Sequence, residues 1–402
     1  MNIQSHPHWP ALSKIYHKLV DNGYKAYLAG GCVRDALLNK QANDLDLATD
    51  ATPDAIEKLF VKTVAVGKAF GVMLVIEDGI SFEVATFRSD GTYADGRRPD
   101  SVVFTTPEED ARRRDFTVNA LFYDLNQGRV LDFVGGLKDL ADKKIKAVGV
   151  PEDRFKEDHL RLLRAVRFAA QLSFEIEPET FAAVKHLAPS VKTVSAERIH
   201  EESFKLLKSE NALLGLKLLQ ESGIGKVLFP GWQNIYAKSQ KEYQLLFASN
   251  QKDEAFLWLA FLTPWALQKD LEWGWIIDTY RFSRLLHKTL KRSLEHIENP
   301  KHFFLATPGE QMALLGDESV RLFIRVCDIL GIEKIGVERL QKQWRTWGEK
   351  MPEPWVKGDD LKNRFDGREL GIWLHKLFVM QLEGRFASRE EMMNQLPNLL
   401  KT

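Results

Sequence analysis

The sequence predicts an α+β protein: a small mixed sheet with helices in the N-terminal part, followed by an all-α remainder. Three β-rich runs, at residues 61–67, 72–79 and 80–88, predict the sheet. An Asp-Gly pair at the end of the second run is typical of a tight hairpin turn. From about residue 206 the apolar residues recur at helical spacing, which predicts the all-α remainder.

Composition sets limits on domains and partners. The 402 residues are enough for two or three domains, so sizeable cores are expected. The 56 basic and 56 acidic side chains exclude a generally basic surface for nucleic acid, so any basic patch is local. Cys32 and Cys327 lie far apart, which argues against a disulfide framework or a zinc site. With no targeting segment or long apolar run, we expect a soluble cytoplasmic protein.

Two helices are predicted around the first part of the sheet. Leu12, Ile15 and Leu19 have the spacing of an amphipathic helix over residues 9–20 that packs on the sheet. A further helix is expected to start at Thr52, a capping residue that is followed by proline.

The segment between these helices carries the first chemical motif. Gly30-Gly31 breaks an apolar run and opens a helix, where backbone N–H groups can approach a triphosphate. Asp44 and Asp46 follow on a short apolar run that we expect to be a strand, so both carboxylates would project to one face. Such a pair suits Mg²⁺, which takes hard oxygen ligands and shares them with substrate phosphates.

Two further features in the sheet region have two interpretations each. Glu83 stands in an otherwise apolar strand, either as a third carboxylate beside the metal or as a surface acid on an edge strand. After it, glycines and charges predict a flexible loop, although a solvated hairpin tip has the same composition. The loop residues of interest are Arg88, Asp90, Tyr93, Arg97 and Arg98.

Two arginine-rich segments follow. In the first, Arg114 and Asp115 directly precede an apolar run, which can direct a guanidinium onto phosphate oxygens; a solvated helix face is the alternative. In the second, an acid and three arginines recur every three residues along a predicted helix, either to recognise base edges and phosphates or as an ion-pair ladder. These residues are Asp158, Arg161, Arg164 and Arg167.

Taken together, these motifs resemble the class II branch of the nucleotidyltransferase superfamily that contains DNA polymerase β. This branch comprises CCA-adding enzymes and bacterial poly(A) polymerases. The resemblance runs from about Tyr24 to Ser209 and fades after it. It implies a polymerase-β-like catalytic head at 1–140, a helical neck with a base template at 141–208, and a helical body and tail for RNA binding at 209–402.

The resemblance also implies residue roles. Asp44 and Asp46 would be catalytic metal ligands, with Glu83 as a third catalytic acid. Asp158 and Arg161 would act as a protein template for the incoming base, while Asp115 and Asn119 would lie near the ribose. The nucleotide-binding set is Gly30, Gly31, Arg34, Arg114, Asp115, Asn119, Asp158, Arg161, Arg164 and Arg167.

The C-terminal half offers one candidate RNA contact. Arg281, Arg284, Lys288 and Lys291 recur along one face of a predicted helix, which is either a phosphate-contacting stripe or a solvated face.

The function predicted is addition of CCA to the tRNA 3′ end from CTP and ATP with Mg²⁺, by a monomer. A bacterial poly(A) polymerase or an enzyme that adds only CC or only A would share the same motifs. A non-catalytic RNA-binding protein of the same fold and a small-molecule nucleotidyltransferase are the alternatives from other classes.

Overall fold

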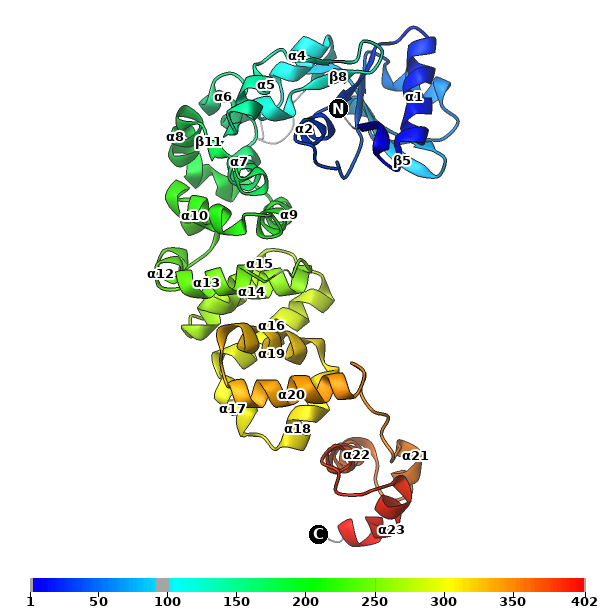
Figure 1. Cartoon of the computed structure of the whole chain (residues 1–402), viewed down its shortest axis with the longest axis vertical. Coiled ribbons are helices and arrows are strands. Elements are labelled where there is room, and N and C mark those ends of the chain that lie inside the picture. Colours follow the sequence, from blue (N-terminus) through cyan, green and yellow to red (C-terminus); the bar gives the residue numbers. More distant parts are fainter. Residues whose placement is uncertain (1–2, 92–100, 250, 401–402) are drawn as a thin grey trace. The chain divides into compact units, whose positions relative to one another are not determined.

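The computed structural model describes residues 3–91, 101–249 and 251–400. The chain forms two compact units, Met1–Phe229 and Pro230–Thr402, each with its own packed elements (Figure 1). The first unit contains the sheet and the motifs discussed above.

The sheet of the first unit is mixed, as predicted. The seven strands make six neighbouring pairs, five of them antiparallel. The sixth pair, β2 with β5, runs parallel, with Leu47 opposite Val84. In spatial order the strands are β3 (Thr63–Gly67), β4 (Val72–Glu77), β5 (Ile80–Thr86), β2 (Leu47–Thr49), β1 (Ala26–Ala29), β8 (Phe122–Asp124) and β9 (Arg129–Leu131). Two short pairs lie outside this sheet: β6 (Arg88–Asp90) with β7 (Val102–Phe104), and β10 (Lys144–Ile145) with β11 (Glu175–Ile176).

The local signals in the head give the expected elements. Helix α1 (Trp9–Asp21) buries the predicted apolar face and packs on β1 and β4. Thr52 caps α3 (Pro53–Leu59) by accepting a hydrogen bond from the Ala55 N–H. Asp78 and Gly79 have φ of 51° and 79°, the left-handed values that a two-residue turn between β4 and β5 requires.

Helices make up most of the remainder of the first unit. Besides α1 and α3, the helices of this unit are α2 (Gly31–Leu37), α4 (Pro107–Arg112), α5 (Gly136–Ala141), α6 (Pro151–Glu157), α7 (Leu160–Leu172), α8 (Pro178–Leu187), α9 (Ala196–Leu207), α10 (Ala212–Ser222) and α11 (Ile224–Leu228). Helix α7 is buried along most of its length and packs on α9 and α10.

The described residues of the second unit form helices and no strands, as predicted (Figure 1). Trp258 and Trp265 are fully buried on α14, which packs against α13 and α16. The helices are α12 (Trp232–Lys238), α13 (Gln240–Phe247), α14 (Glu254–Leu267), α15 (Glu272–Thr279), α16 (Arg284–Glu298), α17 (Pro300–Leu305), α18 (Pro308–Ala313), α19 (Glu318–Leu330), α20 (Lys334–Thr346), α21 (Gly358–Leu361), α22 (Gly367–Leu382) and α23 (Arg389–Leu399). Throughout the described parts of the chain, we find no helix with the length and apolar character to cross a membrane.

Candidate active site

One cavity of about 780 Å³ in the first unit collects most of the residues that the sequence motifs pointed to. Its walls come from the sheet, from the segment after α4 and from α7. The predicted residues that line it are Gly30, Gly31, Arg34, Asp44, Asp46, Glu83, Arg88, Arg114, Asp115, Asn119, Asp158, Arg161, Arg164 and Arg167.

The glycine turn lies between β1 and α2 at one wall of this cavity. Gly30 has a φ of 72°, and a Cβ atom there would lie 2.8 Å from Nη1 of Arg114. The glycine is therefore needed for two reasons: the left-handed backbone, and the close approach of a guanidinium group to the main chain. That guanidinium also donates to the backbone oxygen of Asn119 at 3.2 Å.

The two aspartates lie just before β2 and not within a strand, which corrects the prediction. The expected alternation nevertheless holds, because Leu45 and Leu47 are buried while Asp44 is exposed and Asp46 is half-buried. The Ala29 N–H donates to the backbone oxygen of Asp46 at 3.1 Å, and this bond extends the pairing of β1 up to the aspartate.

Glu83 comes next to Asp46 through the sheet. Parallel pairing places Leu47 opposite Val84, so the residues before them, Asp46 and Glu83, are also neighbours. Because β5 lies between β4 and β2, the alternative of an edge-strand acid is wrong, although the Glu83 side chain is exposed. The register thus brings Glu83 of β5 next to the aspartate that directly precedes β2, although the two residues are far apart in the sequence.

Burial and mutual repulsion both shape the electrostatics of these acids. Burial, followed by the negative charges of Glu83 and Asp44, raises the pKa of Asp46 to about 7, against the opposing effect of Arg114. Within the described ranges, no three His, Cys, Asp or Glu side chains are close enough to one another to hold a metal ion unaided. A cation at these acids would therefore need further ligands, which substrate phosphates commonly supply.

The opposite wall of the cavity carries guanidinium groups that carboxylates hold in place. Arg34 is 4% exposed, lies 2.7 Å from Oδ1 of Asp35 and donates to the side-chain oxygen of Asn119. Arg114 lies 3.0 Å from the buried carboxylate of Asp110. Both arginines are thus fixed before any ligand arrives.

Asp115 pairs with Arg164 through two hydrogen bonds. Its Oδ2 accepts from Nη2 of Arg164 at 2.6 Å and from Nε at 2.9 Å, and its Oδ1 accepts from Asn119 at 3.2 Å. Burial acts to raise the pKa of the Asp115 carboxyl, but the charge and hydrogen bonds of Arg164, together with Arg161, lower it to about 2.

Asp158 interrupts the helix that the sequence predicted to be continuous. It lies between the end of α6 and the start of α7, so the acid does not share one helical stripe with the three arginines. Arg198 of α9 donates to both of its oxygens, at 3.1 and 2.7 Å. Arg161 instead donates to Glu157 and to the backbone oxygen of Arg154. Among the described residues, no ion pair joins Asp158 to Arg161, Arg164 or Arg167, so the ladder does not form.

Three further residues support this wall. Asp110 accepts from both Arg113 and Arg114. Glu202, 3% exposed, accepts from Arg167 at 2.9 Å. The Phe168 ring lies under the Arg167 guanidinium at 3.5 Å from its centroid. The spacing of Asp110 four residues before Arg114 was a usable signal, whereas nothing local pairs Glu202 with Arg167.

The predicted loop is described only at its base. Arg88 and Asp90 lie on β6, with Nε of Arg88 2.9 Å from Oδ1 of Asp90, and Arg88 also lines the cavity. Tyr93, Arg97 and Arg98 lie outside the described residues.

The predicted stripe in the second unit is only partly helical. Ser283 caps α16, and Arg284, Lys288 and Lys291 are exposed at positions that share one face. Arg281 precedes the helix with a φ of 51°, so it does not belong to that helical face.

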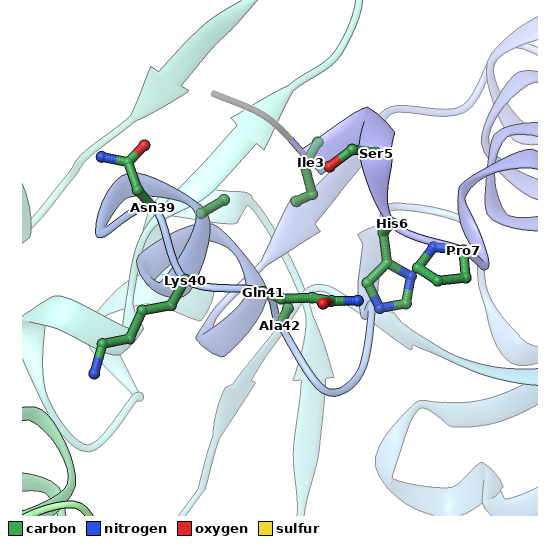
Figure 2. A pocket seen from close by; sticks show the side chains of 9 residues that line it. Ile3, Ser5, His6, Pro7, Asn39, Lys40, Gln41 and Ala42 are labelled. Atoms are coloured by element: carbon green, nitrogen blue, oxygen red, sulfur yellow. The ribbon is translucent and has the colours of Figure 1, made fainter.

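A second hollow of the first unit lacks the chemistry of the first. It measures about 300 Å³ and is lined by the N-terminal segment, including His6, and by residues 39–42 (Figure 2). Lys40 is the cation among its lining residues, and its Nζ lies 3.0 Å from Glu210. This hollow therefore has no charge arrangement comparable to the carboxylates and arginines of the larger cavity.

Comparison with known proteins supplies independent evidence. Residues 26–146 match the family model described as the poly A polymerase head domain, and residues 173–235 match that of a probable RNA and SrmB-binding site of polymerase A. A CCA-adding enzyme of Bacillus licheniformis is 42% identical over 94% of both chains. For a CCA-adding enzyme of Bacillus pumilus the identity is 48%, but the chain spans only 51% of that relative.

Solved structures agree in fold. The Bacillus stearothermophilus CCA-adding enzyme in complex with CTP has a TM-score of 0.77 and 29% identity, with 98% of each chain covered. The Thermotoga maritima CCA-adding enzyme complexed with tRNA has a TM-score of 0.69 and 21% identity, over 99% of this chain and 97% of that one.

Proposed function

Because this chain belongs to the family of CCA-adding enzymes, we propose that it adds C, C and A to the 3′ end of tRNA, using CTP and ATP and releasing pyrophosphate. The observation that carries the proposal is the cavity whose lining brings together Asp44, Asp46 and Glu83 with seven arginines. Acids that can hold a cation on one wall and cations that can hold a triphosphate on the other are the two needs of nucleotidyl transfer.

The metal proposed is Mg²⁺, held by Asp44 and Asp46 with Glu83 beside them. The donor set fits, because these are hard carboxylate oxygens whose mutual repulsion a cation relieves. When bound, Mg²⁺ would lower the pKa of the attacking hydroxyl and offset charge on the phosphates. In this proposal Asp44 and Asp46 are the metal ligands, and Glu83 is a catalytic acid beside Asp46.

The arginine wall would bind and orient the triphosphate. Arg114, Arg164 and Arg167 are already held by Asp110, Asp115 and Glu202, so they lose little conformational freedom when a phosphate arrives. The turn at Gly30 and Gly31, with Arg34 behind it, leaves the main chain open to the same group. Asp115 and Asn119, which are joined to each other, would face the ribose.

Asp158 and Arg161 would select the base. Arg198 fixes the carboxylate of Asp158, and Glu157 fixes the guanidinium of Arg161, so an acceptor and a donor stand side by side without neutralising each other. Such a pair can match the hydrogen-bonding edge of cytosine or adenine. RNA contacts in the second unit are proposed at Arg284, Lys288 and Lys291.

The alternative of poly(A) addition shares this entire site, and so does an enzyme that adds only CC or only A. The similarity over 94% of the chain to a CCA-adding enzyme favours complete CCA addition. The acids of the cavity argue against a non-catalytic RNA-binding protein, because RNA binding alone does not need a cluster of negative charge.

The deciding experiment supplies purified protein with three RNAs: tRNA that ends at the discriminator base, tRNA that ends in CC, and oligo(A). CTP and ATP are added separately and then together with Mg²⁺, and product lengths are read on a gel. We expect two additions with CTP alone on the first RNA, one addition with ATP on the second, and no extension of oligo(A). Long tails on oligo(A) would refute CCA addition in favour of poly(A) synthesis.

A further inference from the structure

We propose that a cavity between α19 and α20 in the second unit binds one unstacked nucleotide of an RNA. The cavity measures about 630 Å³ and is lined by Arg321, Arg325, Trp344, Arg345 and Lys350, among others. That the RNA is the enzyme's own substrate rests on the proposed function; the nucleotide site itself rests on the contacts below.

The first observation is a fixed stack of a guanidinium on an indole. The guanidinium carbon of Arg321 lies 5.2 Å from the centroid of the Trp344 ring. Nη1 of the same arginine donates to the backbone oxygens of Leu315 and Gly316, at 2.8 and 2.9 Å. These two bonds hold Arg321 in place, and within the described residues its Nε and Nη2 form no hydrogen bond. A π surface beside free donors is typical of sites that bind single-stranded nucleotides.

The second observation is positive charge that the protein does not neutralise. Arg345 and Lys350 are exposed and form no ion pair within the described residues. Arg325 donates to Gln251, and its nearest carboxylate oxygen, on Asp253, is 3.9 Å away. Glu349 is the single carboxylate among the lining residues. The rim of the cavity therefore attracts an anion such as the phosphate of a nucleotide.

The third observation concerns size and the apolar floor. Ile324 and Leu340 are buried beneath the cavity, which gives a base an apolar surface as well as an aromatic one. Its volume lies in the range of roughly 300–1,000 Å³ that holds an organic ligand and is far larger than a phosphate ion needs. An anion with a flat, partly apolar group is the chemistry that matches, and a nucleotide has both parts.

The test uses the full chain and a fluorescently labelled tRNA that lacks its terminal CCA, with binding followed by anisotropy at several salt concentrations. Trp344→Ala is expected to weaken binding about tenfold without changing the salt dependence, because stacking involves no counterions. Trp344→Phe, which keeps a ring, should stay within about twofold to threefold of the unmodified protein. Arg345→Glu should lower the slope of log affinity against log salt by about one or more.

Lys342→Glu is the matched control, because Lys342 lies on the same helix and is exposed but does not line the cavity. The proposal is overturned if the cavity variants bind RNA like Lys342→Glu, whether all are unchanged or all are weakened equally. Thermal unfolding of Trp344→Phe and Arg345→Glu checks that the fold is kept. Nucleotide addition is measured separately. If the cavity variants weaken RNA binding but the unmodified protein adds no nucleotide, the proposed function alone is refuted. If the unmodified protein adds nucleotides but the cavity variants bind RNA normally, this inference alone is refuted.

Discussion

The two walls of the large cavity in the first unit differ in whether their charged side chains are paired. On the carboxylate wall, Asp44, Asp46 and Glu83 form no ion pair within the described residues, and burial together with the charges of Glu83 and Asp44 raises the pKa of Asp46 to about 7. On the arginine wall each guanidinium already has a carboxylate within about 3 Å, in the pairs Arg34–Asp35, Arg114–Asp110, Arg164–Asp115 and Arg167–Glu202. An uncompensated wall has affinity for a cation, whereas a paired wall supplies donors in fixed positions.

The largest effect is expected on the carboxylate wall. Asp46→Asn and Asp44→Asn should each reduce incorporation of both CTP and ATP by about 10³-fold or more, because cation binding serves the transition state. RNA affinity should change by about twofold at most. Asp54→Asn is the control, since Asp54 is an acid outside the cavity that pairs with Lys68. Near-normal turnover by either cavity variant would contradict the assignment of this wall.

The next effect concerns the pair that would read the base. Asp158→Ala and Arg161→Ala are expected to reduce discrimination against UTP and GTP by roughly 10–100-fold, because the base loses its hydrogen-bonding partners. Misincorporation is measured with each NTP supplied singly. Glu152→Ala, an acid on α6 that contacts His186, serves as the control. Unchanged fidelity in both variants would show that this part of the arginine wall does not select bases.

A smaller effect tests how strongly the arginine wall is organised in advance. The folded-state pKa of Asp115 is lowered to about 2 from 3.8, so its pairing stabilises the protein above about pH 4, and this stabilisation is lost as pH falls toward 2. Asp115→Asn should therefore lower the free energy of unfolding by roughly 1–3 kcal/mol at pH 7, and the difference should shrink below about pH 4. Urea denaturation between pH 7 and pH 3 measures it, with the exposed Glu175→Gln as control. A difference that does not depend on pH would mean that packing, not charge, is lost.

The smallest effect is expected for a residue of the second unit. Lys288→Ala on α16 should weaken RNA binding only a few-fold and reduce the salt slope by about one, as for a single phosphate contact. Lys301→Ala on α17, also an exposed lysine, is the comparison. Identical salt slopes for the two variants would show that this face of α16 is solvated and does not contact an RNA phosphate. Both walls of the cavity should be unaffected, so CTP and ATP incorporation at saturating RNA should match the unmodified protein.

The sequence by itself determined the local features of this protein. Leu45 and Leu47 alternate with the two aspartates, and burial of the leucines alone directs the acids outward even though the strand starts later than predicted. Thr52 and Thr106 are threonines before proline, and both cap the helices that follow them. Each of these features depends on neighbours within a few residues, for which backbone and capping preferences are sufficient.

Only the tertiary structure decided which charges meet. Asp115 and Arg164 are 49 positions apart, and Arg167 and Glu202 are 35 apart, so no local pattern joins them. The spacing of Asp158 with three arginines favoured one continuous stripe, but a break before α7 turns Asp158 toward Arg198 of α9 instead. The physical reason is that a charged side chain pairs with whichever partner the fold brings within about 3 Å. The packing of α7 on α9 and the parallel pairing of β2 with β5 bring these partners together, and both are properties of the whole fold.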